Sequence, residues 1–575
     1  MKNSVLVMVP SIVVEKVKFR HILLRRRVEV PVRNALTEIA WVRTTAGPMT
    51  VRDVLRQAHD PAIHLQASDP GYVVGTELRV LAAVTAVVLR YDGADPATGR
   101  VHDPERLAVH GLSEDAIGQA MAVLEPGADL DDPVQPFMQR PVLTPAGKKD
   151  TARRIGPGDQ AVKKLLPSMP PDTGEDFWDL RVAQPDHLTV GPATLALAVY
   201  QHYSMAGNGG YDGDKPQMGA PGIRYYSKMS ATELIWRGDS LLHTLLMMIP
   251  HEWVKGDGLP AWVDRTGEKS VVPTGHHPLW RATWSSNTSA TCWDAAGNLV
   301  GTRVGGIPAA WYVPEMGTTK ETRKAWWDQR NEADPFYLYL PGFDGALKAQ
   351  RIDVGRDATE LAVEWAAEGR LEDALTRSSG RVLAPDAESA RVVFIRHHIA
   401  GTASSPSIRL SEVVRPNEDE WRMATSARMA FAIKNDARLL LDLQRVVVRP
   451  FRKGGQGGAK GDGQSAKFPG GTLFNFGVPD ADVSTTYWRE VAPVYEEIVR
   501  LASRTERRLP EGTYKTLRRA VLGAFDAVVA PFGSKDLGKV YAARANLAGR
   551  VNGILRKHGK EPANGELTEG KENDD

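Results

Sequence analysis

Residues 487–502 read YWREVAPVYEEIVRLA, and they determine the fold of the C-terminal part of the chain. The apolar residues of this stretch recur every three or four positions, which places them on one face of an α-helix. They are Trp488, Val491, Tyr495, Ile498 and Ala502. The same spacing returns in 420–449, 517–528 and 537–554. Four such helices predict a four-helix bundle over residues 416–558.

Residues 34–415 have a different character. A strand, a turn and a second strand over 39–49 lead into a helix predicted at Val51–Ala58. Further helices are predicted at Thr76–Arg90 and Pro192–Met205. Strand-like segments follow at Leu279–Trp293, Val300–Trp311 and Arg391–His397. The predicted fold class is therefore α+β, with a large, irregular, mixed α/β N-terminal domain followed by the helical bundle.

Charge is distributed unevenly along the 575 residues, although the net charge is only +2. Residues 1–33 carry a net +6, residues 34–415 a net −9, residues 416–558 a net +9, and the tail 559–575 a net −4. We interpret 1–33 as a basic extension or as a start codon assigned too early. The glycine-rich stretch 453–471 is typical of a flexible loop, and 559–575 of a disordered acidic tail.

The chain has one cysteine, Cys292, which excludes an internal disulfide and a cysteine-based zinc site. No run of 18 apolar residues occurs, so we expect no membrane span. Lys2 and the apolar 4–14 resemble a signal peptide only faintly, because Pro10 interrupts them and no cleavage site follows. We expect a cytoplasmic protein.

Common catalytic motifs are missing from the sequence. It has no G-x-x-x-x-G-K-[ST], no G-x-S-x-G and no H-E-x-x-H, since Lys255 stands where the second histidine of His251-Glu252 would be. The pairs His276-His277 and His397-His398 are either packed histidines or metal ligands, and adjacent side chains on a strand point to opposite faces. A metal-dependent hydrolase using His251, Glu252 and His276 or His277 stays open as an alternative.

Two further features are open to interpretation. The cluster 207–213 follows a helix, so it is either a helix C-cap with a loop or bare backbone that approaches an anionic ligand.

Arg544 falls within the apolar stripe of the last helix, between Val540 and Leu547. It forms either an ion pair with Glu490 or Glu497, or a contact with phosphate.

Several motifs occur in a fixed order along the chain. The most specific is Gln135-Pro136-Phe137-Met138-Gln139. The others are Ala40-Trp41-Val42-Arg43, 50–55, 164–170 with Phe177, 241–250, Tyr487-Trp488-Arg489 and 542–547. Together they resemble the CasA family, the large subunits of the type I-E CRISPR surveillance complex (Cascade), over about residues 34–558.

The resemblance implies a subunit without catalytic activity that reads the protospacer-adjacent motif of double-stranded DNA. We expect no cofactor and no metal; some members of the family bind zinc through cysteines, which the single cysteine of this chain excludes. It implies that Gly207, Asn208, Gly209 and Gly210 approach this motif through the narrow minor groove. The donor and acceptor pattern of that groove is degenerate, so several related motifs should be tolerated. Phe177 and Trp178 would begin a loop that contacts the guide RNA and neighbouring subunits.

Two DNA-reading elements of the family fall on residues that differ from its pattern. The family's basic finger corresponds to the turn 295–298, which offers Asn298 with Arg303 nearby and holds no lysine. Its glutamine wedge corresponds to 365–369, which offers Trp365, Glu368 and Gly369 and holds no glutamine. Trp365 is either an unstacking wedge or a core residue.

The resemblance also implies that basic residues of the bundle hold a DNA strand, here Lys539, Arg544 and Arg550. The function expected is recognition of the motif, strand separation with R-loop formation, and recruitment of a helicase–nuclease in antiviral defence. The partners expected are the other Cascade subunits, the guide RNA, target DNA and that nuclease, with no membrane. A free-standing DNA-binding scaffold is a second alternative.

Overall fold

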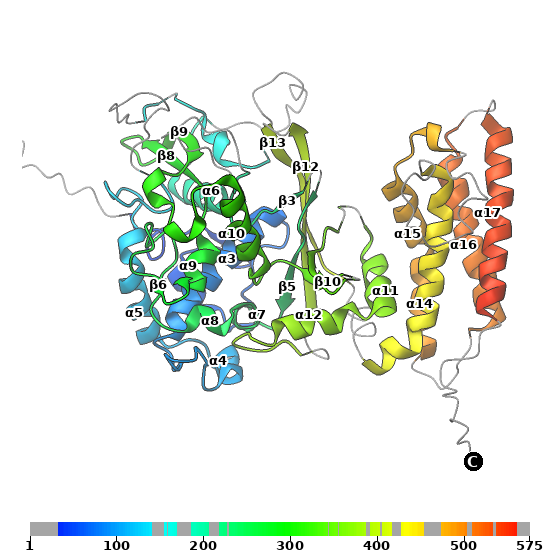
Figure 1. Cartoon of the computed structure of the whole chain (residues 1–575), viewed down its shortest axis with the longest axis horizontal. Helices are drawn as coiled ribbons and strands as arrows, with labels where there is room; N and C mark the ends of the chain where they lie inside the picture. Colours follow the sequence, from blue (N-terminus) through cyan, green and yellow to red (C-terminus); the bar gives the residue numbers. More distant parts are fainter. Residues whose placement is uncertain are drawn as a thin grey trace, which may run out of the picture.

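A computed structural model describes most of the chain. The described residues are 33–140, 155–157, 159–168, 186–205, 218–226, 229–342, 344–352, 354, 356–386, 391–402, 405–416, 427–452, 473–502, 509–532 and 536–559. They form an N-terminal body, blue to green in Figure 1, and a helical bundle beside it, yellow to red. This mixed body followed by a helical region confirms the predicted fold class.

The body contains most of the described elements. Its α-helices are α2 (Val51–Gln57), α3 (Gly71–Leu89), α4 (Pro104–His110), α5 (Glu114–Leu124), α6 (Val190–Tyr203), α7 (Leu241–Met248), α8 (His251–Val254), α9 (Pro278–Thr283), α10 (Lys320–Glu332), α11 (Ala358–Glu368) and α12 (Arg370–Ser378). Its two-stranded sheets are β1 (Val42–Thr44) with β2 (Gly47–Met49), β6 (Val271–Val272) with β7 (Gly275–His276), β8 (Asn287–Trp293) with β9 (Leu299–Gly306), and β10 (Tyr339–Pro341) with β11 (Leu347–Ala349). Short 3₁₀ helices are η1 (Glu125–Gly127), η2 (Val162–Leu165), η4 (Ala309–Trp311) and η5 (Pro314–Met316).

Helix α3 is the central element of the body core. All of its residues are buried, and the sequence prediction placed its start five residues too late. Among the described residues it is also the one helix long and apolar enough to cross a membrane, but it lies wholly inside the protein. Its first residue packs tightly on the sheet, because a Cβ on Gly71 would lie 2.7 Å from Ile395 and 2.9 Å from the carbonyl of Glu412.

The largest sheet covers α3 on one side and is antiparallel. Its strands are β3 (Tyr225–Tyr226), β4 (Met229–Ser230), β5 (Glu233–Arg237), β12 (Arg391–Thr402) and β13 (Ser405–Val414). The order is β13-β12-β4-β3, and β5 also pairs with β12. The register sets Val393 opposite Ile235 and Ile395 opposite Val413, so these aliphatic side chains share one face.

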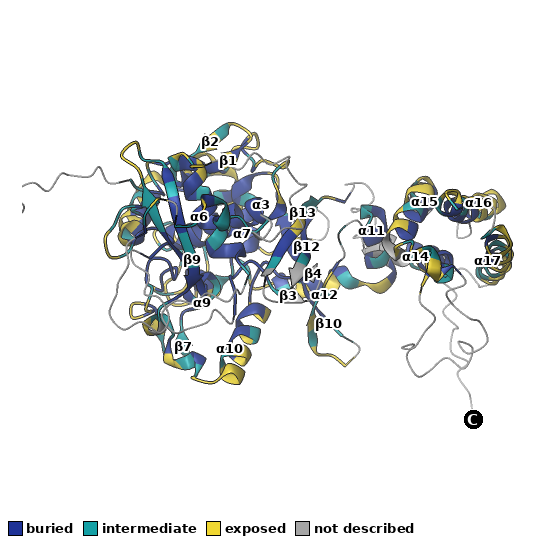
Figure 2. Cartoon of the chain, turned by 90° about the horizontal axis from the view of Figure 1, so that it is seen from above, coloured by how far each residue is buried: buried dark blue, intermediate teal, exposed yellow. Residues whose placement is uncertain are grey.

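The bundle consists of four helices, as the spacing predicts. They are α14 (Ala427–Val448), α15 (Asp480–Ala502), α16 (Glu511–Val529) and α17 (Leu537–His558), with the 3₁₀ turns η6 (Arg449–Phe451) and η8 (Phe474–Phe476). Trp488, Val491, Tyr495 and Ile498 are buried in its core, as predicted. Figure 2 shows the buried faces of the four helices turned toward one another.

Helix α11 belongs to two cores. Leu361 and Trp365 pack in the body core, whereas Ala362, Val363 and Ala367 pack in the core of the bundle. Figure 1 shows α11 between the sheet and α14. The chain therefore contributes a helix to the bundle core well before residue 416, where the sequence predicts that the bundle begins.

One predicted strand is wrong in its first half. Leu279–Thr283 is helical, because Pro278 occupies the first turn of α9 and the His277 side chain caps its amide groups. The strand begins only at Asn287. The predicted extension before Arg33, the loop 453–471 and the tail from residue 560 lie outside the described residues.

Candidate nucleic-acid interface

The hairpin β8–β9 and the residue before it hold both flanks of one predicted nucleic-acid loop and the returning flank of the other. The predicted DNA loop Gly207–Gly210 and the predicted RNA-loop residues Phe177 and Trp178 themselves lie outside the described residues. Their anchoring points on either side are described, and these points decide where the two loops leave the body.

The flanks of the glycine segment (residues 206–217) meet at the start of β8. The Asn287 side-chain amide donates to the Ser204 hydroxyl over 2.9 Å and to the Met205 carbonyl over 3.1 Å. On the returning side, the Gly219 amide donates to the Ser286 hydroxyl over 2.8 Å. Two adjacent residues therefore hold both ends of the segment, so its base is narrow and fixed.

The two flanks of segment 169–185 lie on different strands. Just before the segment, the Ile408 amide of β13 donates to the Pro167 carbonyl over 2.9 Å, and the chain around Gln160 and just after the segment pairs with β9. Leu188 and Leu299 exchange backbone hydrogen bonds of 3.0 and 2.8 Å, and the Thr302 amide donates to the carbonyl of Gln160 over 3.1 Å. Arg303 forms an ion pair of 3.0 Å with Asp159. Strand β9 thus holds the returning flank of segment 169–185, whereas β13 contacts the flank that leads into it.

The motif Gln135–Gln139 contacts strand β8 of the same hairpin. Phe137 is fully buried between Trp41 and Trp262, with ring centroids 6.3 and 5.5 Å away. After it the chain turns sharply, with Met138 at a φ of +51°, and the Gln139 side chain accepts a hydrogen bond from Thr291 on β8. The residues that carry the family resemblance therefore position β8.

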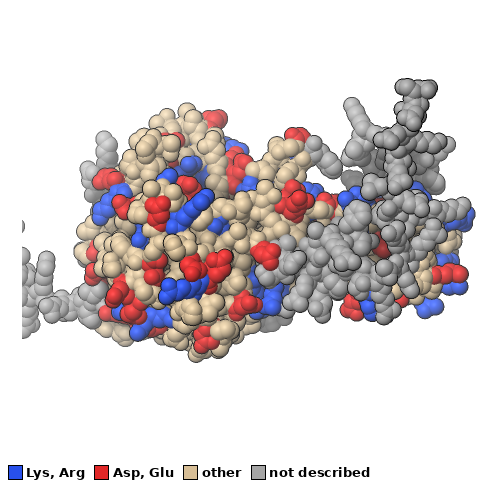
Figure 3. Space-filling model, turned by 90° about the horizontal axis from the view of Figure 1, so that it is seen from below, with Lys and Arg blue, Asp and Glu red and all other residues tan. Residues whose placement is uncertain are grey.

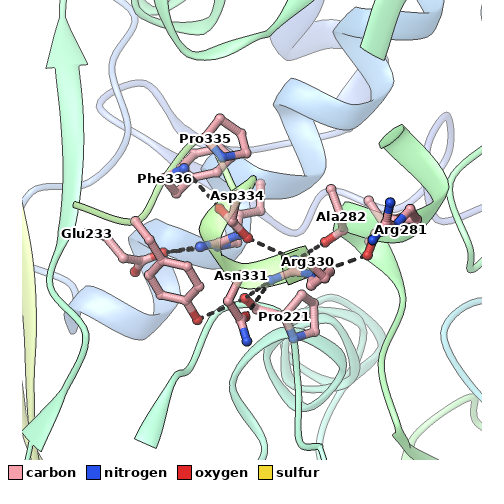
Figure 4. A network of polar contacts seen from close by, with 12 residues as sticks. Pro221, Glu233, Arg281, Ala282, Arg330, Asn331, Asp334, Pro335 and Phe336 are labelled. Carbon is pink, nitrogen blue, oxygen red and sulfur yellow. Dashed lines mark hydrogen bonds and ion pairs between the residues drawn. The ribbon is translucent and has the colours of Figure 1, made fainter. Parts of the chain in front are cut away.

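A buried ionic network braces the residues next to the hairpin. Asp334 lies between two guanidinium groups, 2.9 Å from Arg79 and 2.8 Å from Arg330. Figure 4 shows Arg330 reaching Pro221, just after the glycine segment, and Arg281 and Ala282, just before β8. The two guanidinium charges hold the pKa of Asp334 below its ordinary value despite its burial.

The predicted finger lies at the far end of the hairpin from the glycine segment. Asn298 donates its side-chain amide to Asp294 over 3.0 Å, and hydrogen bonds from the backbone and side chain of Asn298 hold the pKa of Asp294 below its ordinary value. Strand β8 has seven residues, which separates this turn from Asn287 by roughly 20 Å. Arg303 lies midway, opposite Ala290. The structure does not bring the finger residues to the base of the glycine segment.

Comparisons with known proteins identify the family. The model of the family described as CRISPR-associated protein Cse1 matches residues 39–524. The chain belongs to the Cse1 family. No curated protein matches it significantly.

Solved structures share the fold. CasA (Cse1) from Thermus thermophilus is 16% identical with a TM-score of 0.55, and the match covers 91% of this chain and 100% of that one. Cse1 from Thermobifida fusca is 15% identical with a TM-score of 0.55, over 93% and 99% of the two chains. A chain described as a CRISPR RNA-guided surveillance complex is 15% identical with a TM-score of 0.58, over 92% and 100%.

The predicted wedge residues lie on α11. Trp365 is 4% exposed and packs edge-on against Phe394, with ring centroids 5.7 Å apart. Glu368 pairs with Arg370 over 2.8 Å, and Gly369 ends the helix in the left-handed conformation at a φ of +68°. In this structure Trp365 is a core residue, and its role as a wedge stays a prediction.

The predicted bundle contacts lie on two different flanks of α17. Arg544 faces α16 and pairs with Asp526 over 2.7 Å, instead of with Glu490 or Glu497 of α15. The hydrogen bonds to Asp526 raise the pKa of Arg544. Arg550 and Lys539 lie on the opposite flank by helical spacing, where burial and the charge of Arg449 lower the pKa of Arg550.

The histidines of the hydrolase hypothesis have structural roles. His277 accepts from the Leu279 amide and bonds the carbonyl of Lys255 over 2.6 Å, and His251 bonds the carbonyl of Gly99 over 3.1 Å. His276 lies 3.2 Å from Glu315. The described residues contain no group of three or more His, Cys, Asp or Glu side chains that could hold a metal ion.

Proposed function

We propose that this chain is the non-catalytic large subunit of a cytoplasmic, RNA-guided DNA surveillance complex of the Cascade type. In this role it recognises the protospacer-adjacent motif of double-stranded DNA, promotes strand separation and recruits a helicase–nuclease. Its partners are the other Cascade subunits, the guide RNA and the target DNA. Membership of the Cse1 family over residues 39–524 supports the proposal.

The observation that carries the proposal is the support that one hairpin gives to the glycine segment and to the returning flank of segment 169–185. Asn287 and Ser286 hold the base of the glycine segment, and Leu299 pairs with Leu188 just after segment 169–185. A short, rigid support is what a backbone-reading loop needs, because hydrogen bonds to groove edges depend on position to within a fraction of an ångström. In this proposal the hairpin links the DNA-reading loop to the returning side of the loop that contacts the guide RNA.

The charge pattern is consistent with a subunit that touches DNA at limited points. In Figure 3 lysines, arginines and acidic residues are interspersed over the visible face of the body. Residues 416–558 carry the excess of positive charge. In such a complex the partner subunits supply most of the free energy of DNA binding. Strand separation needs little free energy from this subunit, because replacing DNA–DNA pairing with RNA–DNA pairing is nearly balanced.

The test uses the complex assembled from all its subunits with guide RNA. Affinity is measured for a duplex that carries the motif and for one with the motif scrambled. The double substitution Gly209→Phe and Gly210→Phe should lower the ratio of the two affinities at least tenfold, because side chains exclude the backbone from the minor groove. Gly118→Phe on α5 is the control, since a Cβ there meets no atom within 4 Å.

Two outcomes contradict the proposal. An unchanged affinity ratio in the glycine variant removes the glycine segment from motif reading. Equally tight binding of duplex by the isolated chain, without guide RNA or other subunits, favours a free-standing DNA-binding scaffold.

A further inference from the structure

A cavity of about 410 Å³ lies at the edge of the body core, between the large sheet and α3. Its floor is the sheet face formed by Ile235, Val393 and Val413 on three strands, and Val74 and Leu78 of α3 face that floor. The cavity is separate from the hairpin β8–β9, none of whose residues line it. Aliphatic walls on both sides make a water-filled cavity unfavourable and favour an apolar occupant.

Basic side chains also line this cavity. Arg237 ends β5, Arg415 directly follows β13 and is exposed, and His64 is half-buried. Burial lowers the pKa of His64, and the charges of Arg237 and Arg415 lower it further. Burial and the charge of Arg237 also lower the pKa of Arg415. Two guanidinium groups beside an aliphatic surface favour an occupant that carries negative charge next to an apolar group.

We propose that this cavity binds a segment of a partner protein in which an apolar side chain is flanked by carboxylates. The apolar side chain fills the aliphatic cavity, and the carboxylates pair with Arg237 and Arg415. This docking site is additional to DNA reading, and it rests on the proposed assembly of the chain with partner subunits.

Two features favour a protein segment over a nucleic acid. Apart from His64, the described residues that line the cavity carry no ring on which a base could stack. The cavity also adjoins the end of β13, an edge strand that pairs with β12 alone among the described strands of the sheet. An extended segment can lie along such a strand and insert one side chain into the cavity.

The experiment measures binding of the full-length chain to the guide-RNA-loaded assembly of the other Cascade subunits. Arg237→Glu with Arg415→Glu should weaken binding at least tenfold, because two attractive contacts become repulsive. Ala67→Phe, at an exposed lining residue, should weaken it similarly without changing charge, because the ring occupies the cavity. Arg409→Glu is the control for a single charge reversal, at an exposed arginine of β13 that does not line the cavity, and it should change affinity less than twofold.

A photo-crosslinking residue in place of Ala67 identifies the occupant. In the assembled complex it should link to a partner segment with an apolar residue next to Asp or Glu, as read by mass spectrometry. The proposal is overturned if the double variant and Ala67→Phe, folded by circular dichroism, bind within twofold of wild type. It is also overturned if native mass spectrometry finds a small amphipathic anion that the double variant loses while its affinity for the assembly stays the same.

Failure of the docking proposal differs from failure of the proposed function. Normal assembly of the variants alongside the wild type overturns the docking site alone. A wild-type chain that does not bind the assembly overturns both.

Discussion

Two arginine–aspartate pairs, one in the body and one in the bundle, have nearly the same geometry and opposite surroundings. Arg330 and Asp334 lie 2.8 Å apart, and both side chains are 0% exposed. Arg544 and Asp526 lie 2.7 Å apart, and their side chains are 40% and 45% exposed. The distance between the charged atoms therefore says little about what each pair does.

The two ion pairs differ in their exposure to solvent, and this exposure determines how strongly each charge depends on its partner. In the body, the charges of Arg79, Arg330, Glu233 and Asp334 have left water, so each depends on the others for compensation. In the bundle, water screens the pair, and either partner can exchange the other for a phosphate or a counterion at little cost. The buried pair in the body fixes the scaffold, whereas the exposed pair in the bundle leaves Arg544 able to exchange its partner.

Asp334→Asn should produce the largest effect. It leaves the buried guanidinium groups of Arg79 and Arg330 with less negative charge, which should cost about 3–5 kcal/mol of unfolding free energy. Denaturant unfolding measures it, and Asp526→Asn in the bundle should cost less than about 1 kcal/mol. Equal losses in the two variants would contradict the comparison.

The pH dependence of Asp334 has a definite sign. Its folded-state pKa is lower than the ordinary value, so its stabilising effect is present above the ordinary carboxyl pKa. The effect is lost as pH falls through the folded-state value. The difference in stability between wild type and Asp334→Asn should therefore be full at pH 7 and shrink in acid.

Trp365→Ala tests the junction between the two regions. Because Trp365 packs against Phe394 in the body core, its truncation should cost about 3 kcal/mol. Trp365→Phe should retain most of the stability and should keep strand separation, measured by 2-aminopurine fluorescence in the assembled complex. Normal stability of Trp365→Ala together with lost strand separation would instead make Trp365 the wedge.

Glu77→Gln tests whether burial in the body core raises the pKa of the Glu77 carboxyl. Glu77 on α3 is fully buried and accepts from the Arg43 amide over 2.7 Å, and burial raises its pKa well above the ordinary value. The folded chain then holds a proton that the unfolded chain has released. Wild-type stability should therefore fall as pH rises through the window between the unfolded and folded pKa values.

The glutamine variant lacks this proton and keeps the acceptor for Arg43. Relative to wild type it should gain up to about 1.4 kcal/mol for each pH unit within that window, as measured by thermal unfolding from pH 4 to 9. A stability difference that does not vary with pH would contradict the buried-carboxyl account.

The bundle was predictable from the sequence because one period of apolar residues determines each helix and its buried face. The ionic network was not, since Arg79 and Asp334 are 255 positions apart and only the charges inside the apolar run 71–89 hinted at it. The partner of Arg544 was predicted on the wrong helix, because periodicity does not say which neighbour a flank faces. The motif 135–139 pointed to the family. Its contact with β8 could not be predicted from the sequence and is visible only in the folded structure.

The smallest expected effects distinguish the two flanks of α17. Arg544 faces α16, and Arg550 lies toward Arg449 beyond α14. A strand that runs along the bundle contacts one flank, so only one of Arg544→Gln and Arg550→Gln should reduce the salt dependence of DNA binding. The slope of log K against log salt should fall by about 0.9 for the lost phosphate contact, while stability changes by less than about 1 kcal/mol.

Lys539→Gln should behave as Arg550→Gln does, because helical spacing places both on the same flank. Equal slope changes for Arg544→Gln and Arg550→Gln would mean that DNA wraps the helix, and unchanged slopes in all three variants would remove α17 from the interface.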